Sequence, residues 1–308
     1  MVEFAVRRLL QAIPTLLVIA TVTFFLIRIA PGGPFDSDKN LPPEIQANLD
    51  RKYHLDEPLW VQFGLYLKAL LHGDLGPSYH YRDYDVSELI AGGFAVSGAL
   101  GVMAMALAIV AGVAAGVMAA LGRNSVVDAM VMTAAMTGIS IPNFVIAPVL
   151  LLVFAVFLGW LPAGGWDAGS WRHWLLPVVC LALPQIAYIA RITRGSLLEV
   201  LAAPYIRAAL AKGLPLRRVI MRHALKPALL PVLSYLGPAT AGLITGSVVI
   251  EQIFSIPGVG RYFVLGALNR DYTLVMGVVI FYGVLIVALN FVVDVLYAML
   301  DPKMRPRS

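Results

Sequence analysis

Charged side chains are scarce in this chain of 308 residues: only 13% are Asp, Glu, Lys or Arg, where soluble proteins have about 25%. Hydrophobic residues make up 59%, and the few charges are clustered, so that long uncharged runs separate them. This composition excludes an ordinary soluble domain and predicts an integral membrane protein that crosses the bilayer several times. The net charge of +5 is better explained by loops that face anionic lipid, because the sequence contains no nucleic-acid-binding pattern.

Residues that would carry enzyme chemistry are also missing. Cys180 is the only cysteine, so neither an intrachain disulfide nor a cysteine-based metal site can form. The five histidines show no metal-ligand spacing, and neither G-x-S-x-G nor HExxH occurs. The sequence has no G-x-x-x-x-G-K-[ST] loop, which excludes ATP binding through a P-loop. We therefore expect a chain that is not an enzyme and holds no metal or cofactor of its own.

The acidic residues do not form the buried carboxylate pair that a proton-coupled carrier tends to use inside a span. Glu251, Asp271 and Asp294 stand at the ends of apolar runs, where we expect them to reach water. Asp294 is interpreted as a polar contact at a helix end or between subunits. A membrane chain that could form a transport path, but that has no motif for ATP binding or proton coupling, is predicted to be one subunit of a larger transport complex.

Six uncharged runs are long enough to span a bilayer, which takes roughly 20 apolar residues in a helix. They are Leu9–Ile27, Leu89–Gly122, Ala129–Trp166, His173–Ala190, Pro227–Ile250 and Tyr272–Val293. The two longest runs have room for two spans each, but neither contains a convincing polar turn near its middle. Each is therefore predicted as one long helix with a flanking loop. The predicted fold class is an all-α polytopic membrane protein with six transmembrane helices.

The distribution of Lys and Arg predicts the orientation, because cytoplasmic loops are richer in these residues. They are more numerous in the segments on the side of the N-terminus, which places both termini in the cytoplasm. The first span resembles a signal peptide, but its apolar region exceeds the usual length of about 7–15 residues and no clear A-x-A site follows. We expect a retained anchor helix.

Four regions are expected along the chain: an anchor helix (1–30), a periplasmic cap (31–93), a membrane core (94–300) and a cytoplasmic tail (301–308). The cap carries more acids than cations and shows a helix start at Pro42–Glu44. An amphipathic helix is predicted at Leu59–Lys68 and a turn at Gly73–Pro77. Such an ordered cap could contact an extracytoplasmic partner or only pack on its own helices.

One strongly basic interval, Ala203–Pro227, lies between apolar stretches and predicts two short helices. Pro204 can open the first helix, and Gly213 fits the position after its end. Pro215 can then open the second. In that helix the cations Arg218, Arg222 and Lys226 recur every four residues and share one face, while Leu216, Val219, Ile220 and His223 lie away from them. The spacing alone fits a loop beside anionic lipid as well as a docking site for another protein.

This interval resembles the E-A-A-x-x-x-G-x9-I-x-L-P loop of binding-protein-dependent ABC importer permeases. The match falls on Ala208, Ala209, Gly213 and Leu225, and the sequence departs at Arg207, His223 and Lys226. The peptide branch of the family often has Tyr-Ile-Arg-x-Ala-x-Ala-Lys-Gly followed by Arg-His-Ala-Leu. Tyr205–Gly213 and Arg222–Leu225 are similar to that form.

Landmarks similar to the same branch run from the first span to the tail. They are Ala30–Gly32, Tyr53–Pro58, His72–Ser78, Ile141–Phe144, Ala190–Arg194, Ile256–Gly260, Asn269–Tyr272 and Asp301–Lys303. The likeness is strongest to the B subunits of oligopeptide permeases, notably across Ile189–Gly195 and Arg222–Gly237.

The resemblance implies a type I ABC importer permease fold in a bacterial inner membrane. It implies a second, homologous permease subunit, two cytoplasmic ATPases that bind ATP and Mg, and a periplasmic peptide-binding protein. The cargo would be oligopeptides, moved into the cytoplasm by alternating access; the same machine for dipeptides, nickel or glutathione is an alternative. A stand-alone secondary carrier and a membrane scaffold are more remote alternatives.

The resemblance also implies that the basic interval couples the permease to the ATPases. The expected coupling residues are Tyr205, Ile206, Arg207, Ala208, Ala209, Leu210, Ala211, Lys212, Gly213, Arg217, Arg218, Arg222 and His223. Within this set we expect Tyr205–Gly213 to enter a groove of the ATPase. We expect Arg218, Arg222 and Lys226 to face lipid phosphate.

Polar or small residues inside the predicted spans are expected to line the cargo path or to form hydrogen bonds between helices. They are Ser97, Asn143, Gln185, Ser234, Tyr235, Thr240 and Thr245. A peptide path needs weak and unspecific contacts, so no sharp motif is expected there.

Overall fold

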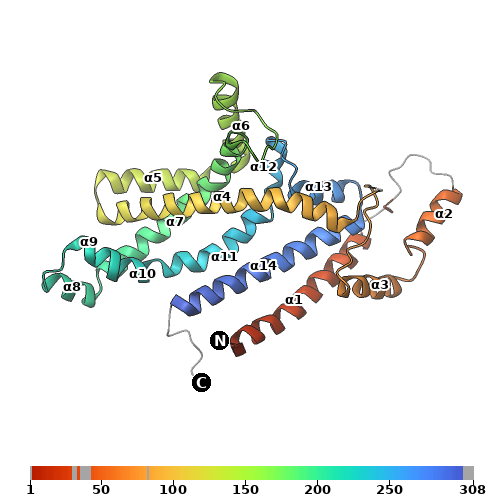
Figure 1. Ribbon diagram of the computed structural model, residues 1–308, viewed down its shortest axis with the longest axis horizontal. Coiled ribbons are helices and arrows are strands. Elements are labelled where there is room, and N and C mark those ends of the chain that lie inside the picture. Colours follow the sequence, from red (N-terminus) through yellow and green to blue (C-terminus); the bar gives the residue numbers. More distant parts are fainter. Residues whose placement is uncertain (1, 30–32, 35–42, 82, 301–308) are drawn as a thin grey trace.

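The computed structural model describes residues 2–29, 33–34, 43–81 and 83–300, and these residues form a row of long helices (Figure 1). In this part of the chain the only β pairing is an isolated bridge between Pro77 and Asp85. The landmark Ala30–Gly32 and the tail 301–308 lie outside the described residues. The predicted all-α class is confirmed.

The helices are named in chain order, with η for a π-helix. The bounds are α1 Val2–Ile29, α2 Pro43–Lys52, α3 Leu59–Leu71, α4 Val86–Leu121, α5 Val126–Ser140, α6 Asn143–Leu151, η1 Leu152–Phe157, α7 Trp171–Leu201, α8 Pro204–Ala211, α9 Leu216–Val219, η2 Ile220–Ala224, α10 Leu225–Ala228, α11 Leu230–Ile244, α12 Val248–Ile253, α13 Val259–Leu268 and α14 Tyr272–Leu300.

Five helical segments are long and apolar enough to cross a membrane, and a bent pair brings the number to six. The five are Leu10–Ile29, Val86–Leu121, Trp171–Leu201, Leu230–Ile253 and Tyr272–Val295. The second begins at Val86, so the boundary expected between cap and core at residue 93 falls inside α4. The fourth predicted span, by contrast, extends past its expected end at Ala190 as far as Leu201.

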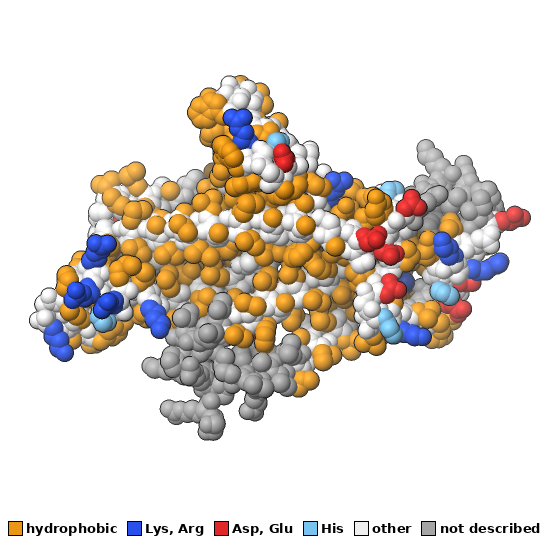
Figure 2. Space-filling model, viewed as in Figure 1, with side chains coloured by type: hydrophobic (Ala, Val, Ile, Leu, Met, Phe, Trp, Pro, Cys, Tyr) orange, Lys and Arg blue, Asp and Glu red, His pale blue; other side chains and the backbone are white. Residues whose placement is uncertain are grey.

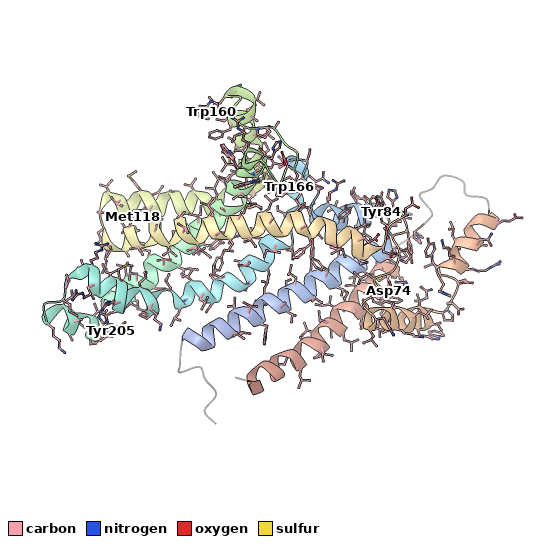
Figure 3. All side chains as sticks on the ribbon, in the orientation of Figure 1. Asp74, Tyr84, Met118, Trp160, Trp166 and Tyr205 are labelled. Atoms are coloured by element: carbon pink, nitrogen blue, oxygen red, sulfur yellow. The ribbon has the colours of Figure 1, made fainter. Side chains whose placement is uncertain are left out.

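The prediction of one long helix in Ala129–Trp166 is wrong. Val126–Ser140 and Asn143–Phe157 are separate helices bent by 102°. Pro142 causes the break, because a proline pushes the preceding residue out of the helical region, and Ile141 has a ψ of 118°. Figure 1 shows α6 rising steeply from the row of long helices, and Figure 3 places Trp160 near the tip of this arm.

Helices α4 and α7 form the centre of the bundle because glycines let their backbones approach closely. A Cβ atom added at Gly112 would lie 2.8 Å from the Cβ of Ile189. One added at Gly116 would lie 2.6 Å from the carbonyl oxygen of Ala190. The largest buried cluster surrounds this contact and includes residues of α4, α7, α11 and α12. Helix α1 lies at the edge of the row, beside α14 (Figure 1).

The fifth predicted span is broken near its end. Helix α11 ends at Ile244, Gly246 adopts a φ of +88°, and α12 starts after Ser247. The hydroxyl of Ser247 accepts a hydrogen bond from the Ile250 amide and caps α12. The chain turns here toward α13, which lies near the start of α14 (Figure 1).

The cap follows the sequence prediction in its described part. Helix α2 begins at Pro43 and α3 at Leu59, and the turn after α3 has φ of +75° at Gly73 and +81° at Gly76. Positive φ at these two positions favours glycine.

Charge separates toward the two ends of the molecule. In Figure 2 Lys and Arg gather over α8 and α9, Asp and Glu gather mostly near α2–α4, and the surface between them is largely hydrophobic. This is the pattern expected of helices that cross a bilayer.

Candidate coupling surface and cargo path

The two short helices predicted in the basic interval are confirmed. The first is α8, and the second is the helical segment that starts with α9 and continues through η2 and α10. Pro204 occupies the first turn of α8, where its missing N–H leaves no carbonyl unpaired. Gly213 has a φ of +79° and lets the chain reverse. Pro215 then directly precedes α9, and the turn is closed by a hydrogen bond from the Leu214 amide to the Ala209 carbonyl, 3.3 Å.

Helix α8 is anchored by buried side chains and also carries large exposed ones. Ile206 is fully buried in a cluster with Leu197 of α7 and Val219 of α9, and Ala209 packs against it. Two large side chains of α8 are exposed, Tyr205 at 51% and Leu210 at 40%. Figure 3 shows Tyr205 at one extreme of the molecule. An anchored helix with an exposed aromatic and aliphatic surface is suited to dock in a groove.

The other residues expected to couple are also at this surface. Those exposed are Arg207, Ala208, Ala211, Lys212, Gly213, Arg217, Arg218, Arg222 and His223. Lys226 is exposed as well. The structure thus brings the expected coupling residues together at one end of the bundle.

The second helix departs from the regular two-sided pattern predicted for it. It runs as α9, the π-helix η2 and α10, so cations four residues apart do not stack as on an ideal α-helix. On the side away from the cations, Val219 and Ile220 are buried, whereas Leu216 and His223 are exposed. Of the four residues predicted to lie away from the cations, the structure therefore buries two.

A bidentate ion pair fixes this end of the bundle from within. Asp128 near the start of α5 accepts hydrogen bonds from Arg194 Nε at 2.5 Å and Nη2 at 2.7 Å. It also accepts one from the Asn124 amide at 3.0 Å. The sequence analysis missed Asp128. The signal that could have found it is the capping pattern in which Ser125 is followed three residues later by an acid.

Glu251 and Asp271 do not reach water, which corrects the prediction made for them. Glu251 is 2% exposed and Asp271 is 0% exposed. Each carboxylate turns inward: Glu251 accepts from the Arg261 amide of the neighbouring helix α13, and Asp271 caps its own helix α14 through the Leu274 amide. The sequence could not show the burial, because the other groups that they bind, such as Ser97 and Ser78, come from distant segments.

The Glu251 carboxylate closes the corner between α4, α12 and α13. Ser97 Oγ donates to it at 2.7 Å and accepts from the Val259 amide at 2.9 Å. The Arg261 amide donates to the other carboxylate oxygen at 3.3 Å. Gly258 is required beside it, because an added Cβ would collide with the carboxylate. Ser97, expected along the cargo path, is therefore 1% exposed and bound in this corner.

Two of the expected path residues lie together in the middle of the bundle. Tyr235 of α11 donates a hydrogen bond to the Gln185 side-chain carbonyl of α7, at 2.5 Å. Both side chains are half-buried, and Tyr235 also packs its ring on Tyr188, with centroids 5.7 Å apart.

The remaining expected path residues lie apart from this pair. Ser234 and Thr245 each donate to a carbonyl of their own helix, and Thr240 is half-buried. The side-chain oxygen of Asn143 is buried at the start of α6 and has no hydrogen-bond partner within the described residues. The structure therefore assembles only Gln185 and Tyr235 from the predicted set.

The apolar helices, five of them long enough to cross a bilayer and a sixth formed by the bent pair, define a polytopic membrane protein in the described part of the chain. Residues 112–306 match the family described as "Binding-protein-dependent transport system inner membrane component". Residues 1–81 match "Binding-prot-dependent transport system membrane comp, N-term". The chain belongs to the family of binding-protein-dependent permeases, as the resemblance of the basic interval implied.

Relatives match over almost the full length. The chain is 56% identical over 305 residues to "Oligopeptide transport system permease protein OppB" of Escherichia coli (strain K12), covering 99% of this chain and 100% of that protein. It is 43% identical to "Dipeptide transport system permease protein DppB" of Bacillus subtilis (strain 168), covering 99% and 98%.

A solved chain of the inward-facing MetNI methionine ABC transporter aligns with a TM-score of 0.58 at 18% identity, covering 70% of this chain and 97% of that chain. The likeness shows a shared fold, that of the type I ABC importer permeases.

Proposed function

We propose that this chain is the permease subunit of an ATP-driven importer that moves oligopeptides from the periplasm to the cytoplasm by alternating access. The observation that carries the cargo assignment is the 56% identity to an oligopeptide permease, which extends over 99% of this chain. In this proposal the chain lies in a bacterial inner membrane with both termini cytoplasmic. The abundance of Lys and Arg on that side supports the orientation.

The chain would supply the path, and its partners would supply the energy. A second, homologous permease subunit would complete the path, and two cytoplasmic ATPases would bind and hydrolyse ATP with Mg. A periplasmic peptide-binding protein would deliver the cargo. The missing P-loop supports this division, because the chain has no such motif with which to bind ATP itself.

Helix α8 would transmit the motion of an ATPase to the bundle. Its buried residue Ile206 packs on Leu197 of α7, and α7 is the helix that packs most extensively on α4. A push on α8 therefore acts directly on the centre of the bundle, since packed helices move as rigid elements. The exposed side chains of Tyr205, Arg207 and Leu210 would form the surface that the ATPase contacts.

The half-buried pair of Gln185 and Tyr235 is the best candidate for a wall of the cargo path. Amide and phenol groups can bind a peptide backbone in any sequence, because each offers a donor and an acceptor. The bond between them pairs the Tyr235 hydroxyl with the Gln185 carbonyl oxygen when no cargo is present.

Dipeptides are a second candidate cargo, favoured by the 43% identity to the dipeptide permease of Bacillus subtilis. The two cargoes differ in length but share peptide chemistry. Uptake competition between dipeptides and longer peptides separates them.

The test is to purify the complex that forms around this chain and to measure its ATPase rate with and without peptide. We expect two ATPase subunits to co-purify and peptide with its binding protein to stimulate hydrolysis. Removing Tyr205–Lys226 should abolish both assembly and stimulation. Normal uptake after that deletion would contradict the coupling assignment.

A further inference from the structure

A pocket of about 300 Å³ lies at the end of the bundle remote from α8, between the last turn of α1, helix α3 and the start of α14. Its lining contains Arg28, Lys52, Tyr66, Tyr79 and Met276, together with the turn around Gly76. Figure 3 places Asp74, another lining residue, close to α3. No residue of this pocket belongs to the coupling surface or to the expected cargo path.

Arg28 is held in place in this pocket by groups that carry no negative charge. Its Nε donates to Gln62 Oε1 at 2.9 Å, and Nη1 contacts the sulfur of Met276 at 3.6 Å. Its guanidinium carbon lies 3.7 Å from the ring centroid of Phe24 and 5.8 Å from that of Tyr272. Among the described residues no carboxylate lies within 4 Å of it to form a salt bridge.

A guanidinium has five N–H donors in a planar fork, and it binds phosphate through two of them at once. The described contacts of Arg28 use one donor on Nε and one on Nη1, so the rest of the fork is open to a ligand. The one acid in the lining, Asp74, is exposed and accepts a hydrogen bond from the Gly76 amide at 2.8 Å.

Tyrosine donors add to the cation. The Tyr66 hydroxyl is buried in the wall of the pocket and has no hydrogen-bond partner within the described part of the chain. Burial raises the pKa of Tyr66 and of Tyr79 to about 12, so both phenols stay protonated at neutral pH. Lys52 brings a second positive charge to the lining. The arrangement is that of an anion site.

The outer surface of α3 indicates where the pocket lies relative to the membrane. Trp60 is 75% exposed and Leu71 is 87% exposed, while Tyr66 and Phe63 face the bundle. A helix with exposed apolar residues at the end of a transmembrane span lies in the interface, the depth at which lipid phosphates are found. The span that carries Arg28 ends one residue later, at Ile29.

We propose that this pocket binds the phosphate of a phospholipid headgroup, with Arg28 as the bidentate ligand and Lys52 and Tyr66 as supporting donors. The lipid would tie α1 to the cap helix α3 at the membrane surface. This site does not depend on the identity of the cargo.

The experiment is native mass spectrometry of the whole importer complex, purified in mild detergent and titrated with phosphatidylglycerol and phosphatidylethanolamine. Arg28→Gln should lower the affinity with which the complex binds a single lipid molecule by about tenfold to a hundredfold. This is the range for a lost charge-assisted bidentate contact. Lys68→Gln, which removes an exposed cation from α3 outside the pocket, should leave the affinity unchanged.

Tyr66→Phe keeps the proposal testable if Arg28→Gln fails to fold. The phenol has no hydrogen-bond partner among the described residues to lose, so a purely structural role predicts no change. The lipid site predicts a loss of about three- to tenfold, as for one hydrogen bond. Tyr282→Phe is the matched control, because its hydroxyl is also buried without a partner but lies on α14 outside the pocket.

Competition identifies the source of the phosphate. Lipid that resists displacement by inorganic phosphate supports a headgroup site, and displacement at millimolar phosphate would instead assign the same pocket to the free ion. Equal lipid retention by the wild type, Arg28→Gln and Tyr66→Phe would overturn the proposal. Displacement by a short acidic peptide but not by any phosphate would overturn it as well.

Discussion

The basic interval at one end of the helix bundle and two buried acids at the other use their charged residues in opposite ways. In the basic interval Arg217, Arg222 and Lys226 are exposed, and Figure 2 shows Lys and Arg gathered at this end of the molecule. At the other end Glu251 and Asp271 are buried and accept hydrogen bonds from distant segments. Asp271 alone binds Ser78 Oγ, the His80 amide and the Leu274 amide.

The difference follows from what each end must do. A buried carboxylate that accepts several hydrogen bonds holds its neighbours in one arrangement, because breaking those bonds leaves unsatisfied groups. Exposed cations hold nothing in the chain, so they are free to meet a partner and release it. The buried end is therefore suited to a fixed corner, and the exposed end to a surface that engages in each cycle.

The largest expected effect is on the buried end, from Glu251→Ala. The substitution removes the acceptor of the Ser97 hydroxyl and of the Arg261 amide and leaves a cavity. We expect the unfolding free energy to fall by about 3–5 kcal/mol, because two buried donors lose their partner at about 1–3 kcal/mol each and a cavity is left. Thermal unfolding of the purified complex measures it.

Glu251→Gln is the matched control, because it keeps the shape and one acceptor oxygen. It should lower the unfolding free energy by less than half as much as Glu251→Ala does. If the alanine variant unfolded at the wild-type temperature, the contrast between a fixed end and an exposed end would be lost.

The next effect separates a buried from an exposed side chain of α8. Ile206→Ala removes a fully buried side chain and should lower the unfolding free energy by about 2–5 kcal/mol. Leu210→Ala removes an exposed side chain of the same size and should change it by no more than about 0.5 kcal/mol. In the proposed function, Leu210→Ala nevertheless lowers ATPase binding.

Thermal unfolding and co-purification of the ATPases, measured on the same samples, test this contrast. A destabilised Leu210→Ala protein would show that the exposed face is part of the fold. Unchanged ATPase binding in that variant would remove Leu210 from the docking surface.

The sequence analysis correctly predicted what depends on local pattern. Proline and glycine positions predicted the breaks around α8, since Pro204 and Gly213 act on their own backbone. Uncharged runs predicted the spans, because a bilayer demands length and apolarity. The same reasoning underrated Pro142, whose effect on Ile141 is also local, because proline is tolerated in many membrane helices.

The features that the sequence could not predict are contacts between segments that lie far apart in the chain. Glu251 and Ser97 are far apart in the chain, and the pairing of a helix-end acid with an interior serine has no local signature. Ser97 was therefore taken as a candidate for the cargo path. The sequence shows Arg28 only as a charge next to an uncharged run, and its pocket appears only when α3 folds back on α1.

A smaller effect is expected at the cap of α5, which shows that the exposed end also has fixed parts. Ser125 Oγ accepts a hydrogen bond from the Asp128 amide at 3.4 Å and caps the helix. Ser125→Ala should lower the unfolding free energy by about 1 kcal/mol. Ser140→Ala is the control. The Ser140 hydroxyl only donates to a carbonyl of its own helix, so its loss should change the unfolding free energy little. Equal melting temperatures of the two variants would contradict a capping role.

The smallest effect on stability is expected from neutralising the cations Arg218, Arg222 and Lys226 together with glutamine. All three are exposed, so the unfolding free energy should change by no more than about 0.5 kcal/mol. If they face lipid phosphate, each contributes about 1 kcal/mol of attraction to an anionic surface. The triple variant should then lose the gain in melting temperature that anionic lipid gives over zwitterionic lipid.

Measuring ATPase binding shows whether the helical segment α9–α10 contacts lipid or the ATPase. We expect the triple variant to retain its ATPases and Arg207→Gln on α8 to lose part of them, because α8 forms the proposed docking surface. Both Arg207 and the three cations are exposed and close in sequence, so nonspecific charge loss would affect the two variants alike. A triple variant that inserts normally but binds no ATPase would show that α9–α10, and not lipid contact alone, belongs to the docking surface.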